Sequence, residues 1–352
     1  MIQEIDVDGL VKLTNPVFVD VRSESEFAEA TIPGAVNLPI FADAERAQVG
    51  TAYRQVSPLA AKDLGLAIVA PKLPRLVKQC RELGTKGELV IFCWRGGMRS
   101  RAVASIIDLM GIKVDRLQGG YKAYRRSIVT YWEQPELPFD VVVLRGNTGT
   151  GKTQLIQALR EHGLPAVDLE NLANNRGSVF GAVGLGAAPS QKQFEACLRE
   201  EIRAFGPVKY VVVECESKRI GRVVLPEVLH KGMQSGKQLL VYDSVPNRVR
   251  RLVKEYTAFL TSDPELEAAL SRLDKRLGYA KTDELKTKLS NGEYAEFTRI
   301  LLQEYYDPLY GYPNQPDAAY SLSVAMEQPA QALEIIEDFL GSLEEGNGAI
   351  LS

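Results

Sequence analysis

The chain is poor in the residues that build metal centres and disulfide frameworks. Only four cysteines and two histidines occur in 352 residues, and no two cysteines form a C-x-x-C pair. This scarcity argues against a disulfide-stapled fold and against a permanent zinc site. No apolar stretch approaches the roughly 20 residues of a membrane helix, and the acidic N-terminus lacks the apolar segment of a signal peptide. We therefore expect a cytoplasmic protein with no permanent metal and no membrane partner.

The pattern of apolar segments predicts two α/β domains. Over residues 1–132, helical patterns alternate with short apolar strands, expected at residues 16–21, 35–40, 88–93 and 114–118. Residues 133–139, which contain two prolines and two glutamates, are expected to be a linker. The second domain, residues 140–352, has the continuously apolar segments of buried parallel strands. Between about residues 246 and 306 the period becomes 3.6 residues, which predicts a helical block within this domain.

A cysteine in an unusual setting ends the third of these strands. Cys93 is followed by glycines at 96 and 97 and then by a helical pattern. Glycines let several backbone N–H groups turn inward to bind an anion, and Arg95 and Arg99 add positive charge. We expect these groups to lower the pKa of the thiol, so that its thiolate attacks a chalcogen donor. The sequence thus predicts that Cys93, Arg95 and Arg99 are catalytic.

The cysteines also allow a simpler interpretation. Cys93 could be a small buried residue at the end of a strand. Cys80 and Cys197 lie in helical patterns and Cys215 lies inside an apolar strand, so core packing is expected for all three.

A second anion-binding loop begins the second domain. Residues 146–153 carry the pattern G-x-x-x-x-G-K-T directly after a strand and before a helix. The backbone of such a loop surrounds phosphate oxygens, while Lys152 supplies a positive charge and Thr153 an oxygen for Mg²⁺. The motif leaves open whether the ligand is a nucleoside triphosphate or a diphosphate. The predicted phosphate-binding residues are Gly146, Asn147, Thr148, Gly149, Thr150, Gly151, Lys152 and Thr153.

Acidic residues that follow neighbouring strands are candidates for a magnesium or donor site. Asp168 and Glu170 follow one apolar segment, and Glu214 and Glu216 follow another. The carboxyl ends of parallel strands face the usual ligand crevice, although each carboxylate could instead cap a strand or a helix. The glycine-rich segment that comes next offers Arg176 to a phosphate or a nucleic-acid backbone, or is a plain flexible loop.

The first domain resembles a rhodanese. The resemblance lies in the thiol loop and in three further runs, DVRSESEF, IPGAVNLP and LQGGYKAYR. Rhodanese loops commonly carry a catalytic cysteine followed by about five backbone amides, which implies this role for Cys93. Asp20 and Arg22 are then expected to form a structural ion pair, and Ser23 with Glu26 fits a helix capping box.

The whole chain resembles the bacterial tRNA 2-selenouridine synthases, because matching runs span both domains. They include ERAQVGTAYRQ, FCWRGGMRS, GNTGTGKT, DLENLANNRGSVFG, PSQKQFE, VVVECESKRIG and YYDPLYGY. One departure is Asn175, which stands where the family run has a histidine. The resemblance implies a rhodanese-like α/β domain followed by a P-loop NTPase-like parallel α/β domain with a helical insertion or extension.

The resemblance also implies a reaction. Its substrate is tRNA with a 5-substituted 2-thiouridine at the wobble position. Geranyl diphosphate alkylates the sulfur, and selenium from selenophosphate then replaces the S-geranyl group to give 2-selenouridine. On this interpretation Lys152, Arg176 and Mg²⁺ neutralise the departing pyrophosphate, and Cys93 serves the selenium step. An enzyme that supplies selenophosphate is an expected partner.

Basic segments offer candidate contacts to tRNA. Arginine and lysine bind phosphates, and the tyrosines between them, such as Tyr121 and Tyr124, are expected to stack on unpaired bases. Each segment could equally be a solvated helical face. The candidate contacts are Lys122, Arg125, Arg126, Arg248, Arg250 and Arg251.

Two other functions fit the same motifs. One is an ATP-dependent sulfurtransferase or P-loop ATPase whose rhodanese module is a sensor, with no RNA substrate. It predicts tight binding and turnover of ATP. The other is a thiosulfate sulfurtransferase with a structural P-loop appendage.

Overall fold

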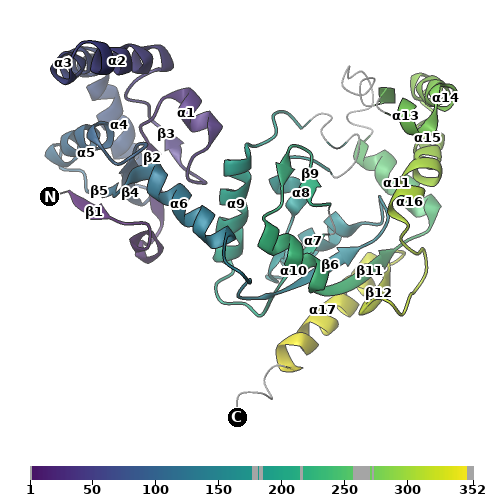
Figure 1. The fold of residues 1–352 in the computed structure, drawn as a ribbon. Helices are drawn as coiled ribbons and strands as arrows, with labels where there is room; N and C mark the ends of the chain where they lie inside the picture. Colours follow the sequence, from purple (N-terminus) through teal and green to yellow (C-terminus); the bar gives the residue numbers. More distant parts are fainter. Residues whose placement is uncertain are drawn as a thin grey trace. The chain divides into compact units, whose positions relative to one another are not determined.

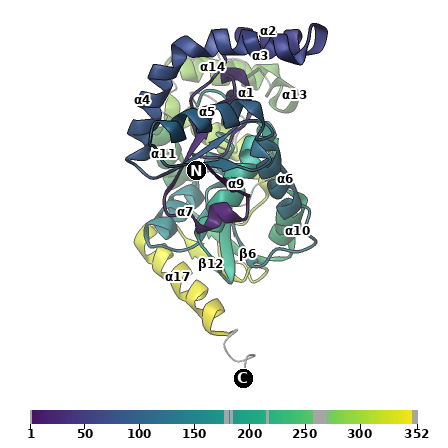
Figure 2. The ribbon, with the colours of Figure 1, turned by 90° about the vertical axis from the view of Figure 1, so that its left-hand side faces the viewer.

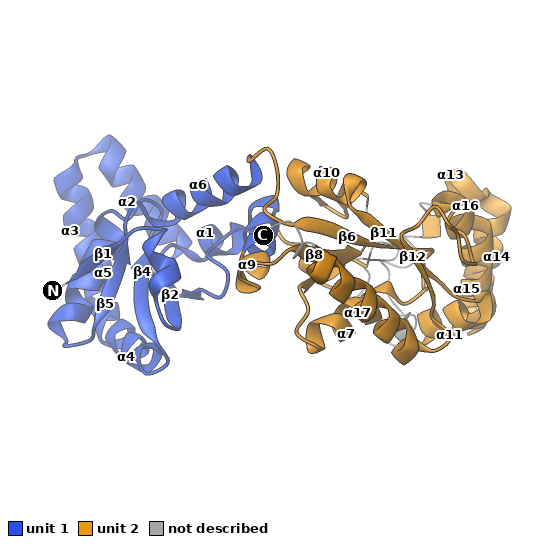
Figure 3. Ribbon diagram, turned by 90° about the horizontal axis from the view of Figure 1, so that it is seen from below, with its two compact units in different colours: residues 1–133, 190–199 blue, residues 134–189, 200–352 orange. Residues whose placement is uncertain are grey.

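The structure, a computed structural model, divides into two compact units. It describes residues 2–176, 181, 185–214, 217–256, 270–271 and 273–346. The first unit comprises residues 1–133 and 190–199, and the second comprises residues 134–189 and 200–352 (Figure 3). Cys215 and Glu216 lie outside the described residues, so the expectations for them are not addressed by the structure.

The first unit is built on a parallel five-stranded sheet in the order β1-β5-β4-β2-β3. The strands are β1 (Gln3–Ile5), β2 (Pro16–Asp20), β3 (Val36–Asn37), β4 (Glu88–Phe92) and β5 (Val114–Leu117). The helices are η1 (Gly9–Lys12), α1 (Glu24–Glu29), α2 (Asp43–Gln55), α3 (Pro58–Val69), η2 (Ala70–Lys72), α4 (Leu73–Gly84), α5 (Met98–Leu109) and α6 (Gly120–Trp132) (Figure 1). The expected α/β sheet is confirmed, and β1 is an additional edge strand that sequence analysis missed.

The core of this unit explains its strand and helix patterns. Val90, Ile91 and Phe92 of β4 are fully buried, as expected for a central parallel strand covered on both faces. Helix α4 buries one stripe of apolar residues, which includes Cys80. Burial raises the pKa of the Cys80 thiol to about 11, which disfavours its thiolate. The packing role expected for Cys80 is therefore confirmed.

Helices α2 and α3 form a hairpin at one end of the first unit. They lie side by side in both views (Figures 1 and 2). Ser57 begins α3, because its side-chain oxygen accepts the Ala60 N–H at 3.0 Å and Pro58 occupies the first turn. On the outer part of α3, Leu59 and Leu66 are 67% and 66% exposed.

Residues 190–199 pack with the first unit although they are distant in sequence. The Thr31 N–H donates to Gln193 Oε1 at 2.8 Å, and Trp132 Nε1 donates to the Glu195 carbonyl at 3.0 Å. Helix α9 (Gln191–Ala204) thus begins in the first unit and ends in the second. Sequence analysis did not predict this division.

The second unit contains a parallel five-stranded sheet in the order β12-β11-β6-β8-β7. Its strands are β6 (Asp140–Arg145), β7 (Ala166–Val167), β8 (Tyr210–Glu214), β11 (Lys237–Tyr242) and β12 (Leu322–Ala325), beside a small antiparallel pair, β9 (Arg219–Ile220) and β10 (Val223–Val224). The helices around the sheet include α7 (Lys152–Glu161), α8 (Leu169–Leu172), α10 (Glu227–Ser235) and α17 (Pro329–Gly346). Strand β6 therefore lies in the middle of the sheet and delivers the phosphate loop at its carboxyl end.

The helical block of the second unit has its own core. Its described helices are α11 (Val245–Tyr256), α13 (Asp274–Leu277), α14 (Tyr279–Ser290), α15 (Tyr294–Leu301), η3 (Leu302–Tyr306) and α16 (Asp307–Tyr310). Leu252, Leu285 and Phe297 from three of these helices are buried together. The expected helical insertion is thus confirmed over the described residues. Among all the residues that the structure describes, no helix has the length and apolar character needed to cross a membrane.

Candidate functional site

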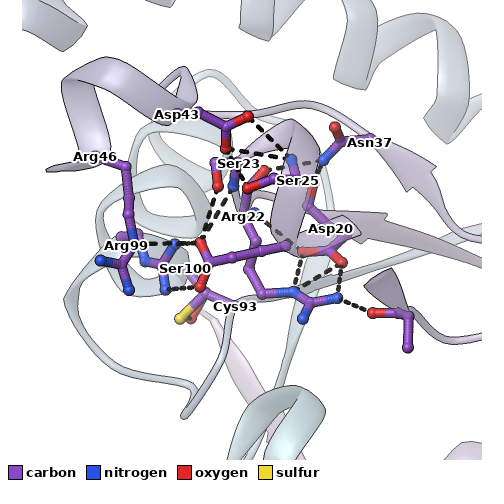
Figure 4. A network of polar contacts seen from close by, with 12 residues as sticks. Asp20, Arg22, Ser23, Ser25, Asn37, Asp43, Arg46, Cys93, Arg99 and Ser100 are labelled. Carbon is purple, nitrogen blue, oxygen red and sulfur yellow. Dashed lines mark hydrogen bonds and ion pairs between the residues drawn. The ribbon is translucent and has the colours of Figure 1, made fainter. Parts of the chain in front are cut away.

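The thiol loop, residues 93–97, connects β4 to α5 (Figure 4). Cys93 is 3% exposed, and its Sγ lies 3.3 Å from Ser100 Oγ in the first turn of α5. The Ser100 hydroxyl also donates to the Gly97 carbonyl at 3.3 Å. The thiol therefore lies at the base of the loop and contacts a hydroxyl group.

The backbone of the thiol loop is held by the start of α6. The N–H groups of Tyr121 and Lys122 donate to the carbonyls of Cys93 and Trp94, each at 2.9 Å. Gly120 permits this approach, because a Cβ at that position would overlap the Cys93 carbonyl oxygen. Within the described part of the chain, the N–H groups of residues 94–97 have no acceptor. Successive N–H groups that are left without acceptors at a glycine turn are available to bind an anion.

The two arginines of the predicted thiol site lie in different surroundings. Arg95 is exposed. Arg99 and Arg46, both labelled in Figure 4, pair with Glu26: Arg99 Nη1 lies 2.6 Å and Arg46 Nε lies 3.6 Å from Glu26 Oε2. Burial alone would raise the pKa of Glu26, but the hydrogen bond from Arg99 and the charges of Arg99 and Arg46 lower it below its usual value. Arg95 is thus the arginine whose charge faces solvent.

A buried ion pair fixes the end of β2. Arg22 Nη2 lies 2.6 Å from Asp20 Oδ2 and also donates to the Ala30 carbonyl at 2.7 Å. The expected ion pair is confirmed, as is the capping box, in which the Ser23 N–H donates to Glu26 Oε2 at 3.3 Å. Such a fully hydrogen-bonded pair holds the loop before α1 in one conformation.

The tyrosines at the start of α6 do not face solvent. Tyr121 and Tyr124 are only 1% and 2% exposed, and the Tyr121 ring centroid lies 4.3 Å from Arg22 Cζ. Burial raises the pKa of Tyr121 to about 12. The expectation that these rings stack on RNA bases is wrong, because the amphipathic helix turns them toward the core.

The three candidate tRNA contacts on α6 differ in how far their side chains are exposed to solvent. Lys122 and Arg126 are exposed, whereas Arg125 forms an ion pair with Glu195. The first two therefore present positive charge on the surface of the first unit.

The phosphate loop, residues 146–153, joins β6 to α7. Among the residues that the structure describes, the N–H groups of Thr148, Gly149 and Gly151 have no acceptor. Lys152 Nζ donates to the Gly146 carbonyl at 2.8 Å and to the Asn147 carbonyl at 3.3 Å, so its ammonium group lies over the loop. The loop thus presents backbone N–H groups and a cation, as a phosphate group requires.

Two arginines of α11 hold the outer side of this loop. Arg248 Nε donates to the Thr148 carbonyl at 2.9 Å, and Arg251 Nη1 donates to the Gly149 carbonyl. Both are paired with carboxylates, since Arg248 Nη1 lies 3.0 Å from Asp307 Oδ2 and Arg251 Nη2 lies 2.8 Å from Asp243 Oδ2. These bonds fix the loop carbonyls, which leaves the N–H groups free for a ligand.

Sequence analysis assigned these arginines to tRNA and missed their contact with the loop. Arg248 has no exposed surface, whereas Arg250 on the same helix is exposed. The spacing of three residues between Arg248 and Arg251 places both on one helix face, which was the available signal. The run YYDPLYGY also supports the phosphate loop. Its Asp307 pairs with Arg248, and its Tyr312 carbonyl accepts from Asn147 Nδ2 at 2.8 Å.

Removal of the buried arginine should destabilise the second unit. Arg248→Ala leaves Asp307 and the Thr148 carbonyl without their donor, so we expect the free energy of unfolding to fall by about 2–3 kcal/mol. Chemical denaturation of the full chain measures this. The matched control is Arg250→Ala, an exposed neighbour that should change stability by less than about 0.5 kcal/mol. Equal effects of the two variants on stability would contradict a stabilising role for the buried contacts of Arg248.

Three of the four predicted carboxylates are described, and two of them interact directly. Glu214 ends β8 at 1% exposure, and its Oε1 accepts the Glu170 N–H at 2.7 Å. Its other oxygen, Oε2, has no hydrogen-bond partner among the described residues. Asp168 is 4% exposed and caps α8, because its Oδ1 accepts the Asn171 N–H at 2.8 Å. Glu214 therefore offers an unused oxygen at the carboxyl end of the strand next to β6.

Burial changes the acidity of this carboxyl group. The pKa of Glu214 is raised well above its usual value by burial, and also by the nearby charges of Asp168 and Glu170. Burial likewise raises the pKa of Asp168. Among the described residues, no group of three or more His, Cys, Asp or Glu side chains could hold a metal ion.

Stability should depend on pH through Glu214. Because its folded-state pKa is raised, the folded chain keeps this proton above pH 4.5, where the unfolded chain releases it. Glu214 therefore contributes stability at low pH that is lost as the pH rises. The Glu214→Gln variant cannot ionise, so its melting temperature relative to the parent chain should increase between about pH 5 and about pH 8. A constant difference in melting temperature would contradict this result.

The segment that follows α8 is described only in part. The Asn175 N–H donates to the Glu170 carbonyl at 2.9 Å, and the Arg176 N–H donates to the Gly181 carbonyl at 3.0 Å. Both side chains are half-buried. The backbone of Asn175 is thus hydrogen-bonded to that of Glu170, one of the candidate carboxylates.

Known proteins resemble both units. The description "tRNA 2-selenouridine synthase AAA domain" matches residues 139–338, and "Rhodanese-like domain" matches residues 6–127. A tRNA 2-selenouridine synthase of Bordetella bronchiseptica is 36% identical in an alignment of 333 positions that covers 86% of this chain and 89% of that protein. One from Sulfurovum is 31% identical in an alignment of 359 positions that covers 94% of this chain and 97% of that protein.

A solved structure matches a shorter stretch. It is the N-terminal domain of a putative ATP/GTP binding protein from Clostridium difficile, 38% identical, covering 36% of this chain and 98% of that chain with a TM-score of 0.35. The predicted fold class is confirmed by the two parallel sheets and by the two domain matches. With a rhodanese-like unit, a P-loop unit and relatives of this identity over most of its length, the chain belongs to the tRNA 2-selenouridine synthase family.

Proposed function

We propose that this enzyme converts a 5-substituted 2-thiouridine at the wobble position of tRNA into 2-selenouridine in two steps. Geranyl diphosphate first alkylates the sulfur, and selenium from selenophosphate then replaces the S-geranyl group. The observation that carries the proposal is one chain with two anion-binding loops, one holding Lys152 and the other Cys93. The name of the relatives speaks against the ATPase and thiosulfate sulfurtransferase alternatives.

The first step uses the phosphate loop. The thiocarbonyl sulfur bonds to C1 of the geranyl chain as the C1–O bond breaks, the nucleobase N3 loses its proton, and pyrophosphate leaves. The N–H groups of Thr148, Gly149 and Gly151, together with Lys152, would neutralise the negative charge that develops on the leaving group. Arg248 and Arg251 position these groups by holding the loop carbonyls.

A magnesium ion bound with the substrate would have few protein ligands near the loop. Glu214 Oε2 is a buried oxygen without a partner in the described chain, and Thr153 lies in the first turn of α7. Mg²⁺ keeps several waters and takes few protein ligands, which agrees with so small a set of carboxylates. We propose that Thr153 and Glu214 hold it, with Asp168 or Glu170 acting through water. When bound, the ion would offset phosphate charge.

The second step uses the thiol loop. The sulfur on C2 was a poor leaving group before the first step, and after S-alkylation it can leave as geranyl thiol. The Cys93 thiolate bonds to C2 of the base and expels geranyl thiol, and the selenium of selenophosphate then bonds to C2 and expels Cys93. Hydrolysis of the Se–P bond releases phosphate, so no atom changes oxidation state. A perselenide on Cys93 would instead require a two-electron oxidant to form from selenophosphate and a two-electron reductant to release the selenium after its transfer.

The backbone N–H groups and the arginine of the thiol loop offer a site for the phosphate part of selenophosphate in this step. The N–H groups of residues 94–97 and the exposed Arg95 would bind the phosphate part of selenophosphate. The positive surface made by Lys122 and Arg126 would contact the tRNA backbone. A tRNA substrate places the reaction in the cytoplasm, with an enzyme that makes selenophosphate as its supplier.

Reconstitution tests the proposal. Purified full-length protein is incubated with tRNA that contains 2-thiouridine, with geranyl diphosphate and with selenophosphate, and the nucleosides are analysed by mass spectrometry. We expect a transient S-geranyl nucleoside followed by 2-selenouridine. Absence of both products would overturn the proposed function.

A further inference from the structure

The first unit contains a large pocket beside the thiol loop. Its volume is about 760 Å³, within the range of about 300–1,000 Å³ that is usual for small-molecule sites. It lies between the α2–α3 hairpin and the first turns of α5, and it is lined by apolar side chains such as Phe41, Val49, Leu66 and Ile106. None of the residues assigned to the two reaction steps explains this apolar lining.

Cations surround the apolar part of the pocket. Arg46 and Arg54 line it from α2, and Arg95 and Arg99 line it from the thiol loop and α5. A pocket lined by both apolar and cationic side chains fits a ligand that joins a hydrocarbon chain to a polyanion. Because Arg95 belongs to both the pocket and the thiol loop, the charged end of such a ligand would lie toward the loop.

Several apolar side chains at this pocket are unusually exposed. Tyr53 is 50% exposed, Met98 is 57% exposed and Leu66 is 66% exposed, and all three line the same pocket. Contiguous exposed apolar surface on a protein marks a binding site more often than isolated residues do. A bound hydrocarbon chain would cover this surface.

We propose that this pocket binds the geranyl chain of the S-geranyl-2-thiouridine in tRNA during the selenium step. The inference rests on the proposed two-step function. The geranyl group supplies the hydrocarbon, and the RNA to which it is attached supplies negative charge that matches Arg54 and Arg95. Geranyl diphosphate is the less suitable occupant, because the phosphate loop already provides the site for its diphosphate and Arg46 and Arg99 already face Glu26. The pocket would thus hold the leaving group next to the loop that displaces it.

A pair of leucines on one helix gives the test. Leu66→Glu places a charge in the pocket, and Leu59→Glu places the same charge on α3 at 67% exposure, outside the residues that line the pocket. Both side chains are largely exposed, so both variants should fold. The substrates are tRNA carrying S-geranyl-2-thiouridine and tRNA carrying S-methyl-2-thiouridine, each with selenophosphate. The readout is kcat/KM for 2-selenouridine formation from each.

We expect the parent chain and Leu59→Glu to prefer the geranyl substrate over the methyl substrate by about tenfold or more, since burial of a hydrocarbon chain favours binding. Leu66→Glu should lose most of this preference, and Ala102→Trp, which fills the pocket from α5, should do the same. An unchanged preference in both pocket variants would overturn the inference while leaving the proposed function intact. A parent chain that converts neither substrate would overturn the proposed function itself. A defect of Leu66→Glu confined to the use of geranyl diphosphate would also overturn the inference, by assigning the pocket to the first step.

Discussion

Lys152→Ala should abolish S-geranylation of 2-thiouridine tRNA, with a rate at least about a hundredfold lower than that of the parent chain. Lys152 is the cation that lies over the phosphate loop, 2.8 Å from the Gly146 carbonyl, and its loss leaves the departing pyrophosphate without that charge. Mass spectrometry of nucleosides after reaction with geranyl diphosphate measures the effect.

The same variant separates the two steps. If Lys152 serves only the departure of pyrophosphate, Lys152→Ala should still form 2-selenouridine from tRNA that already carries the S-geranyl group. The matched control, Lys231→Ala, removes an exposed lysine of α10 and should geranylate normally. Normal geranylation by Lys152→Ala would assign the phosphate loop to another ligand.

Cys93→Ser should show the opposite defect. We expect selenium incorporation to fall at least about a thousandfold, because a hydroxyl group at neutral pH is a far weaker nucleophile than a thiolate. Since the phosphate loop is unchanged, S-geranyl tRNA should accumulate. Time courses with both co-substrates, analysed as nucleosides, measure the two products together.

The control for this variant is Cys197→Ala, which removes a half-buried thiol of α9. It should retain both steps. If Cys93→Ser incorporates selenium at the parent rate, the thiol has no part in the reaction. The N–H groups and Arg95 of the thiol loop would then have to promote selenium transfer without it.

The features that sequence analysis predicted are those that depend on neighbouring residues. The phosphate loop is recognisable because a strand, a glycine-rich turn and a helix follow one another within residues 140–161. The thiol loop is recognisable for the same reason, and the buried pair of Asp20 and Arg22 lies within three residues of chain. Local patterns of this kind require no knowledge of the rest of the fold.

The features that sequence analysis missed depend on residues far apart in the chain. Arg248 reaches the Thr148 carbonyl across 100 residues, and its three-residue spacing from Arg251 shows that the two share a helix face but not what that face contacts. Tyr121 and Tyr124 look like an RNA surface in a basic segment, but the face of α6 that carries them packs inward. The pocket beside α3 is another such feature, since its lining comes from separate helices. Tertiary packing decides the role of each of these residues.

The two hydrogen bonds from α6 to the carbonyls of Cys93 and Trp94 have a consequence for the catalytic cycle. The two peptide units that carry these carbonyls, which include the N–H groups of Trp94 and Arg95, cannot flip without breaking a bond, so their dipoles keep the same orientation. The arrangement that would receive selenophosphate in the proposed second step is therefore supplied by folding and need not be rebuilt between turnovers.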